Sequence, residues 1–158
     1  MHVDLYERIW MWGATAIIAV FLISIGVTTF SQAVVPPSHI ETIDPDEVRS
    51  HSEFGEPGVT IHADGSATVV VQAIMYAFLP REIRVPRGEP VTFRIASPDL
   101  IHGFQIAQTN GNAMVVPGYV TQFTTIFEEA GEYLIVCNEY CGIGHHNMFG
   151  TLIVGDTQ

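Results

Sequence analysis

Lysine is absent from this chain of 158 residues, and arginine supplies all 6 of its basic side chains against 17 acidic ones. Nucleic-acid binding is therefore excluded, because phosphate contacts depend on lysine and arginine. The acidic excess has two interpretations, which composition leaves open. In the first, it steers a basic or polar protein partner toward the chain. In the second, it solvates the surface of a salt-adapted protein. Molar salt shortens the Debye length to roughly 3 Å, so long-range steering would then fail.

Cysteine is also scarce. The chain has 2 cysteines, Cys137 and Cys141, with three residues between them. A disulfide between them would close a very small loop and would therefore gain little loop entropy. It would also leave the neighbouring His145 and Met148 without a role. We therefore expect two free thiols with a chemical function.

Charged residues are missing from Ile9 to Ile40. Within that stretch, Met11–Phe30 alone has the ~20 residues that a transmembrane helix needs. A signal peptide cleaved near Ser31-Gln32-Ala33 is the alternative, but the apolar run exceeds the usual signal core of about 7–15 residues. We expect residues 1–35 to form a retained, single-pass membrane anchor.

The orientation of this anchor depends on one cation, since Arg8 precedes it and the next basic residue is Arg49. Positive charge beside a membrane-spanning helix favours the cytoplasmic side. We therefore expect a cytoplasmic N-terminus and a domain on the outer (periplasmic or extracellular) face of the cell membrane. Pro36-Pro37 should end the helix. Residues 36–66 are predicted to be a polar linker, and residues 67–158 the domain.

Helical periodicity is absent beyond residue 50, apart from a single turn at Pro45–His51, and the chain has no internal repeat. From Ala67 onward, short segments rich in β-branched residues alternate with turn residues. Short strands with turns every 8–12 residues or so indicate a sandwich or barrel, so the domain should be mainly β. The predicted strands are Thr68–Met75, Glu82–Val85, Val91–Ala96, Gly103–Ile106, Met114–Val116, Tyr119–Phe127, Tyr133–Val136 and Met148–Val154.

Potential metal ligands are concentrated between Cys137 and Met148. Two thiols, the imidazole of His145 and a thioether fall within twelve residues, and His102 lies 35 positions upstream of Cys137. Thiolate, imidazole and thioether together select copper, whereas zinc takes cysteine, histidine and carboxylate. Because Cys137 and Cys141 can each bridge two metals, these ligands suit a pair of coppers better than one.

Some of these residues have simpler interpretations. Met148 also suits a hydrophobic core, and His102 alone would usually be a hydrogen-bonded loop histidine. His146 adjoins His145, but neighbouring side chains on a strand or loop point in opposite directions, so His146 is not expected to be a ligand. The histidines with no cysteine nearby, expected at the surface, are His2, His39, His51 and His62.

The pattern Cys-x-Glu-x-Cys-Gly-x-x-His-x-x-Met from Cys137 to Met148 resembles the dinuclear copper (CuA) signature of cytochrome c oxidase subunit II. The resemblance extends through Val85–Gly88, Ser97–Phe104 and Phe149–Thr151. The short chain and single anchor look most like the B-type branch of the haem-copper oxidases. The resemblance implies a cupredoxin-like Greek-key β-sandwich with the metal at one end, attached to one N-terminal transmembrane helix.

The resemblance also implies the site. Two copper ions would be bridged by Cys137 and Cys141, one capped by His102 with Met148, the other by His145 with the backbone carbonyl of Glu139. In many relatives the side chain of this glutamate binds a magnesium ion at the contact with the catalytic subunit, which implies the same for Glu139. Where the family often has a tryptophan that first receives the electron, in the stretch Ile74–Phe78, this chain has Tyr76.

The function that follows is electron acceptance in a membrane terminal oxidase. A soluble cytochrome c or small blue copper protein would donate single electrons. The chain would pass them to haem in catalytic subunit I of an oxygen-reducing, proton-translocating cytochrome c oxidase. The chain itself would only transfer electrons. A quinol oxidase subunit would share the fold without the cysteine ligands.

Three other functions use similar residues. A membrane-anchored mononuclear blue-copper carrier needs only Cys141, His145 and Met148, which leaves Cys137 unused. A copper-delivery chaperone for oxidase assembly also pairs two such cysteines with a distant histidine, but it requires a thioredoxin-like αβ pattern. A nitrous oxide reductase carries the same copper pair with a large second domain, which is absent from these 158 residues.

Overall fold

The computed structural model describes residues 4–32 and 41–155, which belong to two compact units, residues 1–39 and 40–158. In the first unit, Leu5–Gln32 forms helix α1. Its apolar part, Leu5–Thr28, is 24 residues long, or about 36 Å at the rise of an α-helix. That length is sufficient to cross a hydrocarbon core of about 30 Å. The prediction of one N-terminal apolar helix is confirmed, whereas Pro36 and Pro37 lie outside the described residues.

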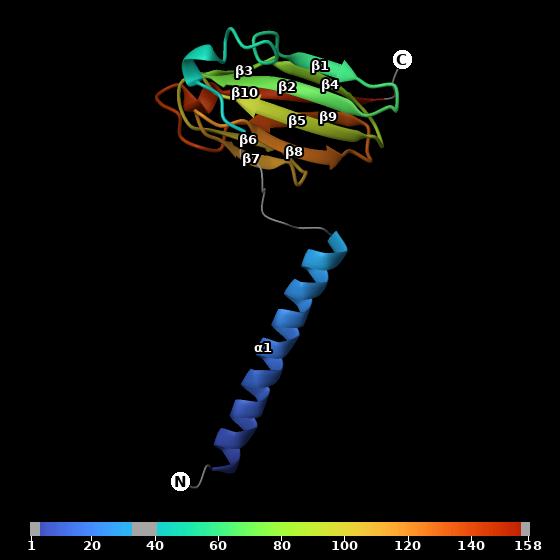
Figure 1. Ribbon diagram of the computed structural model, residues 1–158, viewed down its shortest axis with the longest axis vertical. Helices are drawn as coiled ribbons and strands as arrows, with labels where there is room; N and C mark the ends of the chain where they lie inside the picture. The colour runs from blue at the N-terminus through green and yellow to red at the C-terminus, as the bar shows by residue number, and fades with distance from the viewer. Residues whose placement is uncertain (1–3, 33–40, 156–158) are drawn as a thin grey trace. The chain divides into compact units, whose positions relative to one another are not determined.

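The second unit is a sandwich of two five-stranded β-sheets (Figure 1). The first sheet has the order β1-β2-β5-β8, with β3 paired to β2, and the second has the order β4-β10-β9-β6-β7. The predicted sandwich is confirmed. The strands are β1 (Gly58–Ile61), β2 (Ala67–Ile74), β3 (Ala77–Leu79), β4 (Glu82–Pro86), β5 (Pro90–Ala96), β6 (His102–Ile106), β7 (Asn112–Val115), β8 (Thr121–Ile126), β9 (Gly131–Val136) and β10 (Phe149–Gly155), with 3-10 turns η1 (Pro45–Glu47) and η2 (His145–Asn147).

Phenylalanine rings fill the space between the sheets. Phe78, Phe93 and Phe104 are fully buried. The Phe104 ring lies 5.2 Å from Phe78, edge to face, and 5.6 Å from Phe93, while Phe123 stacks on Phe93 at 5.0 Å. Such aromatic pairs stabilise a core beyond the area that they bury. This core holds the strands that carry the candidate ligands in a fixed register.

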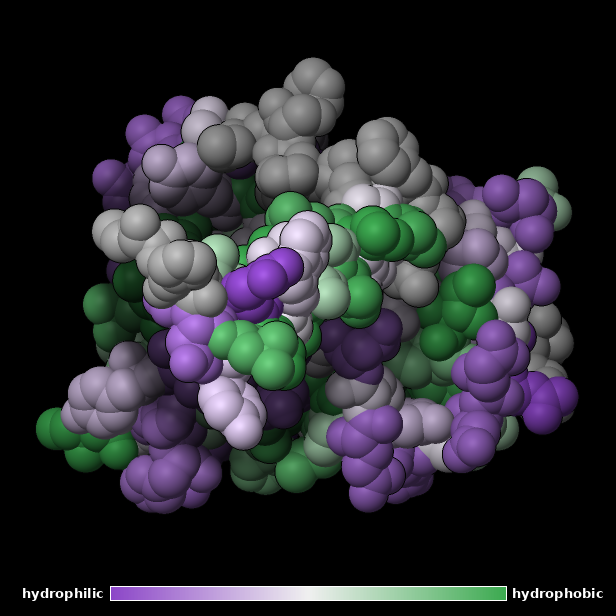
Figure 2. All heavy atoms as spheres, turned by 90° about the horizontal axis from the view of Figure 1, so that it is seen from below, coloured by the Kyte–Doolittle hydropathy of each residue, from purple (hydrophilic) through white to green (hydrophobic). Residues whose placement is uncertain are grey.

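The strand directions define two ends of the sandwich. β2 and β5 run parallel, and the chain leaves β5 at Ala96 and starts β6 at His102. We call the end at which β2 and β5 finish and β6 begins the His102 end. Many acidic residues lie in turns or strand ends at the opposite end, namely Asp64, Glu89, Glu128, Glu129 and Glu132. Hydrophilic side chains (purple) and hydrophobic side chains (green) are both present on the face shown in Figure 2.

Residues 41–61 fall within the range expected for a linker, but they are part of the folded unit. β1 extends the first sheet by pairing with β2. Val48 and Phe54 are fully buried and Ile43 nearly so, in a second apolar cluster with Ala96. The apolar residues of this segment are too widely spaced to show strand or helix periodicity, so the sequence does not reveal that they pack on a sheet.

Arg94 attaches the same segment to β5. Its guanidinium binds the carboxylate of Glu53 through Nε and through Nη2, the latter at 2.8 Å, and both Nη atoms bind Glu41 at 2.8 and 3.0 Å. The Arg94 side chain is 18% exposed. The hydrogen bond from Arg94 is the main cause of the lowered pKa of Glu41. The first residues described after the anchor are thereby held against the first sheet.

Replacing Arg94 with leucine should destabilise the domain by about 1–2 kcal/mol, because two carboxylates lose charge-assisted hydrogen bonds. Denaturant unfolding of the domain measures the change. Since the folded pKa of Glu41 lies below its usual value of 4.5, its contribution is present above pH 4.5 and is lost as pH falls through the folded pKa. The matched control is Arg84→Leu, which breaks an exposed pair with Glu82. An equal loss in both variants would contradict a specific role for Arg94.

Candidate metal centre

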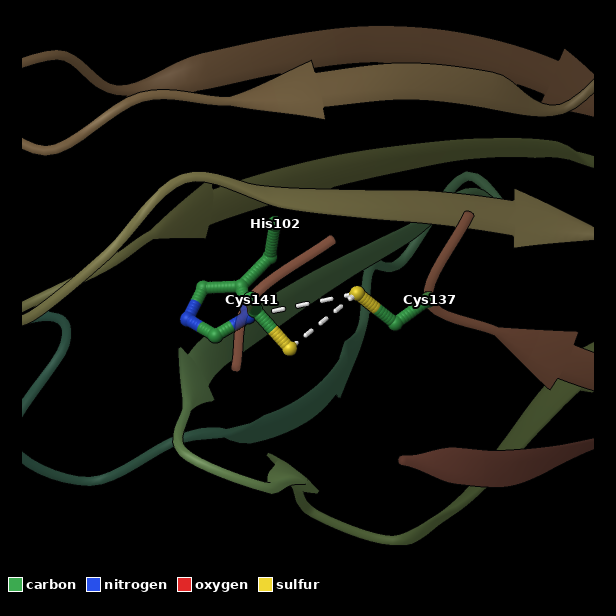
Figure 3. A group of neighbouring side chains, drawn as sticks. All are labelled: His102, Cys137 and Cys141. Atoms are coloured by element: carbon green, nitrogen blue, oxygen red, sulfur yellow. Dashed lines mark hydrogen bonds between the residues drawn. The ribbon is translucent and has the colours of Figure 1, made fainter. Parts of the chain in front are cut away.

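The pairing of three strands brings the predicted ligands together. β6 and β9 are antiparallel neighbours, so the start of β6 at His102 and the end of β9 at Val136 lie at the same end of the sandwich. β9 and β10 are also antiparallel, so the loop that connects them, residues 137–148, returns to the His102 end. In Figure 3 the side chains of His102, Cys137 and Cys141 point toward one another.

Cys137 lies between the upstream histidine and the second cysteine. Its Sγ is 4.0 Å from His102 Nδ1, 3.8 Å from Cys141 Sγ and 3.1 Å from the carbonyl oxygen of Glu139. Donor atoms that each lie about 2.0–2.3 Å from one metal are separated by roughly 3.3–4 Å. The sulfur–sulfur and sulfur–nitrogen distances fit such an arrangement.

Cys141 extends the cluster on its other side. Its Sγ is 3.6 Å from His145 Nδ1 and 3.7 Å from Met148 Sδ. Met148 is 2% exposed, as is Cys141, whereas His145 is half-buried. All six predicted donors, including the Glu139 carbonyl, therefore form one connected cluster around two sulfurs.

Both thiols are buried, and the thiol of Cys141 resists ionisation. Burial, followed by the hydrogen bond with Cys137 and the charge of that residue, raises the pKa of Cys141 to about 11. A cation held by the sulfurs would offset these effects, because coordinating thiols are deprotonated outright. With imidazole and thioether beside them, the thiolates make a donor set suited to copper. The residues therefore fit the metal that the sequence implies.

Asp99 is a functional residue that the sequence did not single out. Its Oδ1 lies 2.8 Å from Nε2 of His102, which is fully buried. Burial alone would raise the pKa of Asp99, but hydrogen bonds from His102 and from the backbone amides of Met75 and Leu100 lower it. An ionised carboxylate at Nε2 fixes the ring tautomer, so that the lone pair of Nδ1 faces the sulfurs. The sequence feature that could have indicated this role is an acidic residue three positions before a ligand histidine.

Two close approaches require glycine. A Cβ on Gly103, the residue after His102, would collide with the side chain of Asn138 in the ligand loop. A Cβ on Gly144 would lie 2.5 Å from the ring of Tyr76. β6 and the Tyr76 ring therefore pack directly against the backbone of residues 137–148.

Tyr76, the residue predicted to receive the electron first, follows β2 at the His102 end and is 38% exposed. His146 is exposed, and its Nε2 lies 3.0 Å from Nδ2 of Asn147. His62 is exposed, but His51 is half-buried against Phe54. His2 and His39 lie outside the described residues.

Comparisons with known proteins indicate the family of this chain. Residues 57–154 match the family described as cytochrome C oxidase subunit II, periplasmic domain. The chain is 40% identical over 153 residues to cytochrome c oxidase subunit 2 of Thermus thermophilus. This alignment covers 94% of this chain and 91% of that protein.

Solved structures show the same fold. A chain in a haem-copper terminal oxidase dimer superposes with a TM-score of 0.75 at 29% identity, covering 95% of this chain and 99% of that one. The periplasmic domain of subunit II of cytochrome oxidase from Bradyrhizobium japonicum gives a TM-score of 0.53 at 16% identity, covering 64% of this chain and 88% of that one.

The β-sandwich, with its histidine, cysteine and methionine donors at one end, is a cupredoxin-like copper-binding domain that follows one apolar helix. The predicted fold class is thus confirmed. The chain belongs to the cytochrome c oxidase subunit II family. It is accordingly a subunit of a haem-copper terminal oxidase, and its domain is the electron-accepting part.

Proposed function

We propose that this chain holds a dinuclear copper centre and passes single electrons from a soluble donor to haem in the catalytic subunit. The observation that carries the proposal is the central position of the two sulfurs. Cys137 has His102 and Glu139 beside it, while Cys141 has His145 and Met148. A single metal would leave part of this set without a role.

Two coppers bound there would share one electron, and spreading the charge would keep bond-length changes small. The proposed ligands are His102, Cys137, the Glu139 carbonyl, Cys141, His145 and Met148. The protein's part is to supply two thiolates that bridge and two buried or half-buried imidazoles that are held in place. The Glu139 side chain is a separate donor, and we assign it to a magnesium ion shared with the catalytic subunit.

The anchor defines the proposed topology. Helix α1 would cross the membrane once, with Arg8 and the N-terminus in the cytoplasm and the copper domain on the outer face. That topology places the domain where a soluble cytochrome c or small blue copper protein can reach it. It also tethers the domain to catalytic subunit I in the same membrane.

The donor is proposed to dock at the His102 end. This end exposes six apolar side chains around the ligands: Met75, Tyr76, Leu100, Ile101, Tyr140 and Ile143. Tyr76 contacts the ligand loop itself, so it combines an exposed surface with proximity to the centre. An apolar, largely uncharged contact of this kind depends little on ionic strength.

The alternative functions differ in fold or in metal count. Residues 41–155 form β-strands and two 3-10 turns without an α-helix, which does not suit a thioredoxin-like copper chaperone. A mononuclear carrier would bind one copper. The number of coppers per chain therefore separates the remaining two functions.

A chain lacking residues 1–35 should remain folded and bind two coppers, because all proposed ligands lie in the compact unit that begins at residue 40. Purified fragment is loaded with copper and its metal content is measured. The Cys137→Ser fragment is the control for non-specific copper. One copper per chain in well-folded material would contradict the dinuclear proposal.

Met148→Leu should retain both coppers but shift the reduction potential, because a thioether is a long, weak ligand that tunes potential rather than affinity. Titration of the copper spectrum against a redox mediator measures the shift. His146→Ala should leave both spectrum and potential unchanged, whereas His145→Ala should alter them. The reverse result for the two histidines would overturn the ligand assignment.

A further inference from the structure

The turn between β2 and β3 contacts the candidate centre at two separate places. The amide of Met75 donates to Oδ2 of Asp99 at 2.9 Å, and Oδ1 of the same carboxylate lies 2.8 Å from Nε2 of His102. The next residue, Tyr76, lies with its ring against Gly144 of the ligand loop. One turn is therefore joined to the ligand on β6 and to the loop between β9 and β10.

Only an ionised carboxylate suits the first of these contacts. The Met75 N–H and the His102 Nε2–H are both donors, and a carboxylate accepts at both oxygens. An amide would present one oxygen and one NH2 group, so one of the two donors would face another donor. Asp99 is held in this orientation by the Leu100 amide, which donates to Oδ1 at 2.7 Å, and by the Ser97 hydroxyl, which accepts from the Asp99 amide at 3.3 Å.

We propose that Asp99 is a positioning residue that locks the Met75–Tyr76 turn to His102, so that the donor-facing surface and a copper ligand keep one fixed arrangement. The inference rests on the proposed copper site, and it adds a mechanical link between the surface on which the donor docks and the ligands. Removing the carboxylate loosens the turn and the imidazole together. Neither effect requires a change in fold.

The decisive variant is Asp99→Asn in the full-length chain in detergent. Before copper is added, amide hydrogen exchange at Met75 should become about tenfold faster, as expected for the loss of one hydrogen bond to a charged acceptor. After copper is added, its affinity should fall about 10- to 100-fold, as is typical when the partner of a ligand histidine is removed. The reduction potential should rise, because a neutral partner makes His102 a weaker donor to the oxidised form.

The matched control is Glu82→Gln. Glu82 lies at the start of β4, is exposed and pairs with Arg84 at the surface, so the variant removes the same charge without touching the centre. Exchange at Met75, copper affinity and potential should all remain at their original values. A control that changes them as much as Asp99→Asn does would overturn the proposal in favour of a general charge effect.

The link itself is tested by the combination of readouts. Unchanged exchange at Met75 in Asp99→Asn overturns the proposal, and so does faster exchange with unchanged copper affinity and potential. If Asp99→Asn fails to fold, Ser97→Ala removes the hydroxyl that accepts from the Asp99 amide and lies 3.2 Å from its carboxylate. Exchange at Met75 and copper affinity should then change in the same direction by a smaller factor. No change there overturns the proposal as well. Failure of the dinuclear centre is distinguishable, because it shows as one copper in the unaltered chain and leaves exchange at Met75 as it was.

Discussion

Serine at position 137 or 141 should abolish the paired copper centre completely, which is the largest single effect expected for this protein. Cys137 and Cys141 lie 3.8 Å apart at the centre of the donor cluster, and each is assigned to both coppers. A serine hydroxyl is a hard donor with little affinity for copper in this setting. Absorption and EPR spectra of the copper-loaded variants measure the loss.

The two serine variants should be equivalent in this respect, because neither sulfur belongs to one metal alone. His146→Ala serves as the matched control, since it changes a neighbouring side chain that is exposed. The dinuclear assignment would be contradicted by either serine variant retaining two coppers that share one electron. Loss in Cys141→Ser only, with Cys137→Ser intact, would favour the mononuclear carrier.

Tyr76→Ala should slow electron transfer from the native donor about 30-fold or more at subsaturating donor concentrations. Truncation of a central aromatic contact costs about 2 kcal/mol or more, whereas an exposed ion pair contributes roughly 0–1 kcal/mol and weakens with salt. The acidic residues named above lie at the opposite end of the sandwich, so they should steer the donor little. Stopped-flow kinetics across ionic strength measures both effects.

Tyr76 also packs on Gly144, so the variant must be shown to keep the copper spectrum of the wild type. Tyr76→Phe retains the ring and should be nearly as fast as the wild type. Ile126→Ala is the control for truncation of an exposed apolar residue at the opposite end. Two results together would establish electrostatic docking instead: a wild-type electron-transfer rate that falls steeply with salt, and a Tyr76→Ala rate equal to that of the wild type.

The candidate ligands could be predicted from the sequence because four of the ligand side chains lie within twelve residues. Cysteine, histidine and methionine at that density have few structural explanations. His102 was harder to predict as a ligand, since its proximity to Cys137 depends on the antiparallel pairing of β6 with β9. The resemblance to a family supplied what spacing alone did not.

Asp99 could not be recognised in the same way. Its role depends on which atoms face its two oxygens, and one of them is the backbone amide of Met75, 24 positions away. A carboxylate in a Ser-Pro-Asp turn looks like an ordinary turn residue. The contact between Tyr76 and Gly144 was hidden for the same reason, since neither residue shows its partner in the sequence.

The start of the folded unit was also hidden. Glu41 and Glu53 gave the linker its polar composition, but in the structure both bind Arg94 on β5. The apolar residues between them, Val48 among them, are buried without any periodic pattern. Sequence patterns predict which strands exist when their side chains alternate, but not which irregular segment covers a sheet.

Spin quantification by EPR on the copper-loaded full-length chain, with copper content measured on the same sample, tests the central claim most directly. Two coppers that share one electron carry one unpaired spin between them. The proposed centre therefore predicts two coppers per chain and one spin for every two coppers in the oxidised form. One copper per chain with one spin per copper would contradict it and identify a mononuclear site.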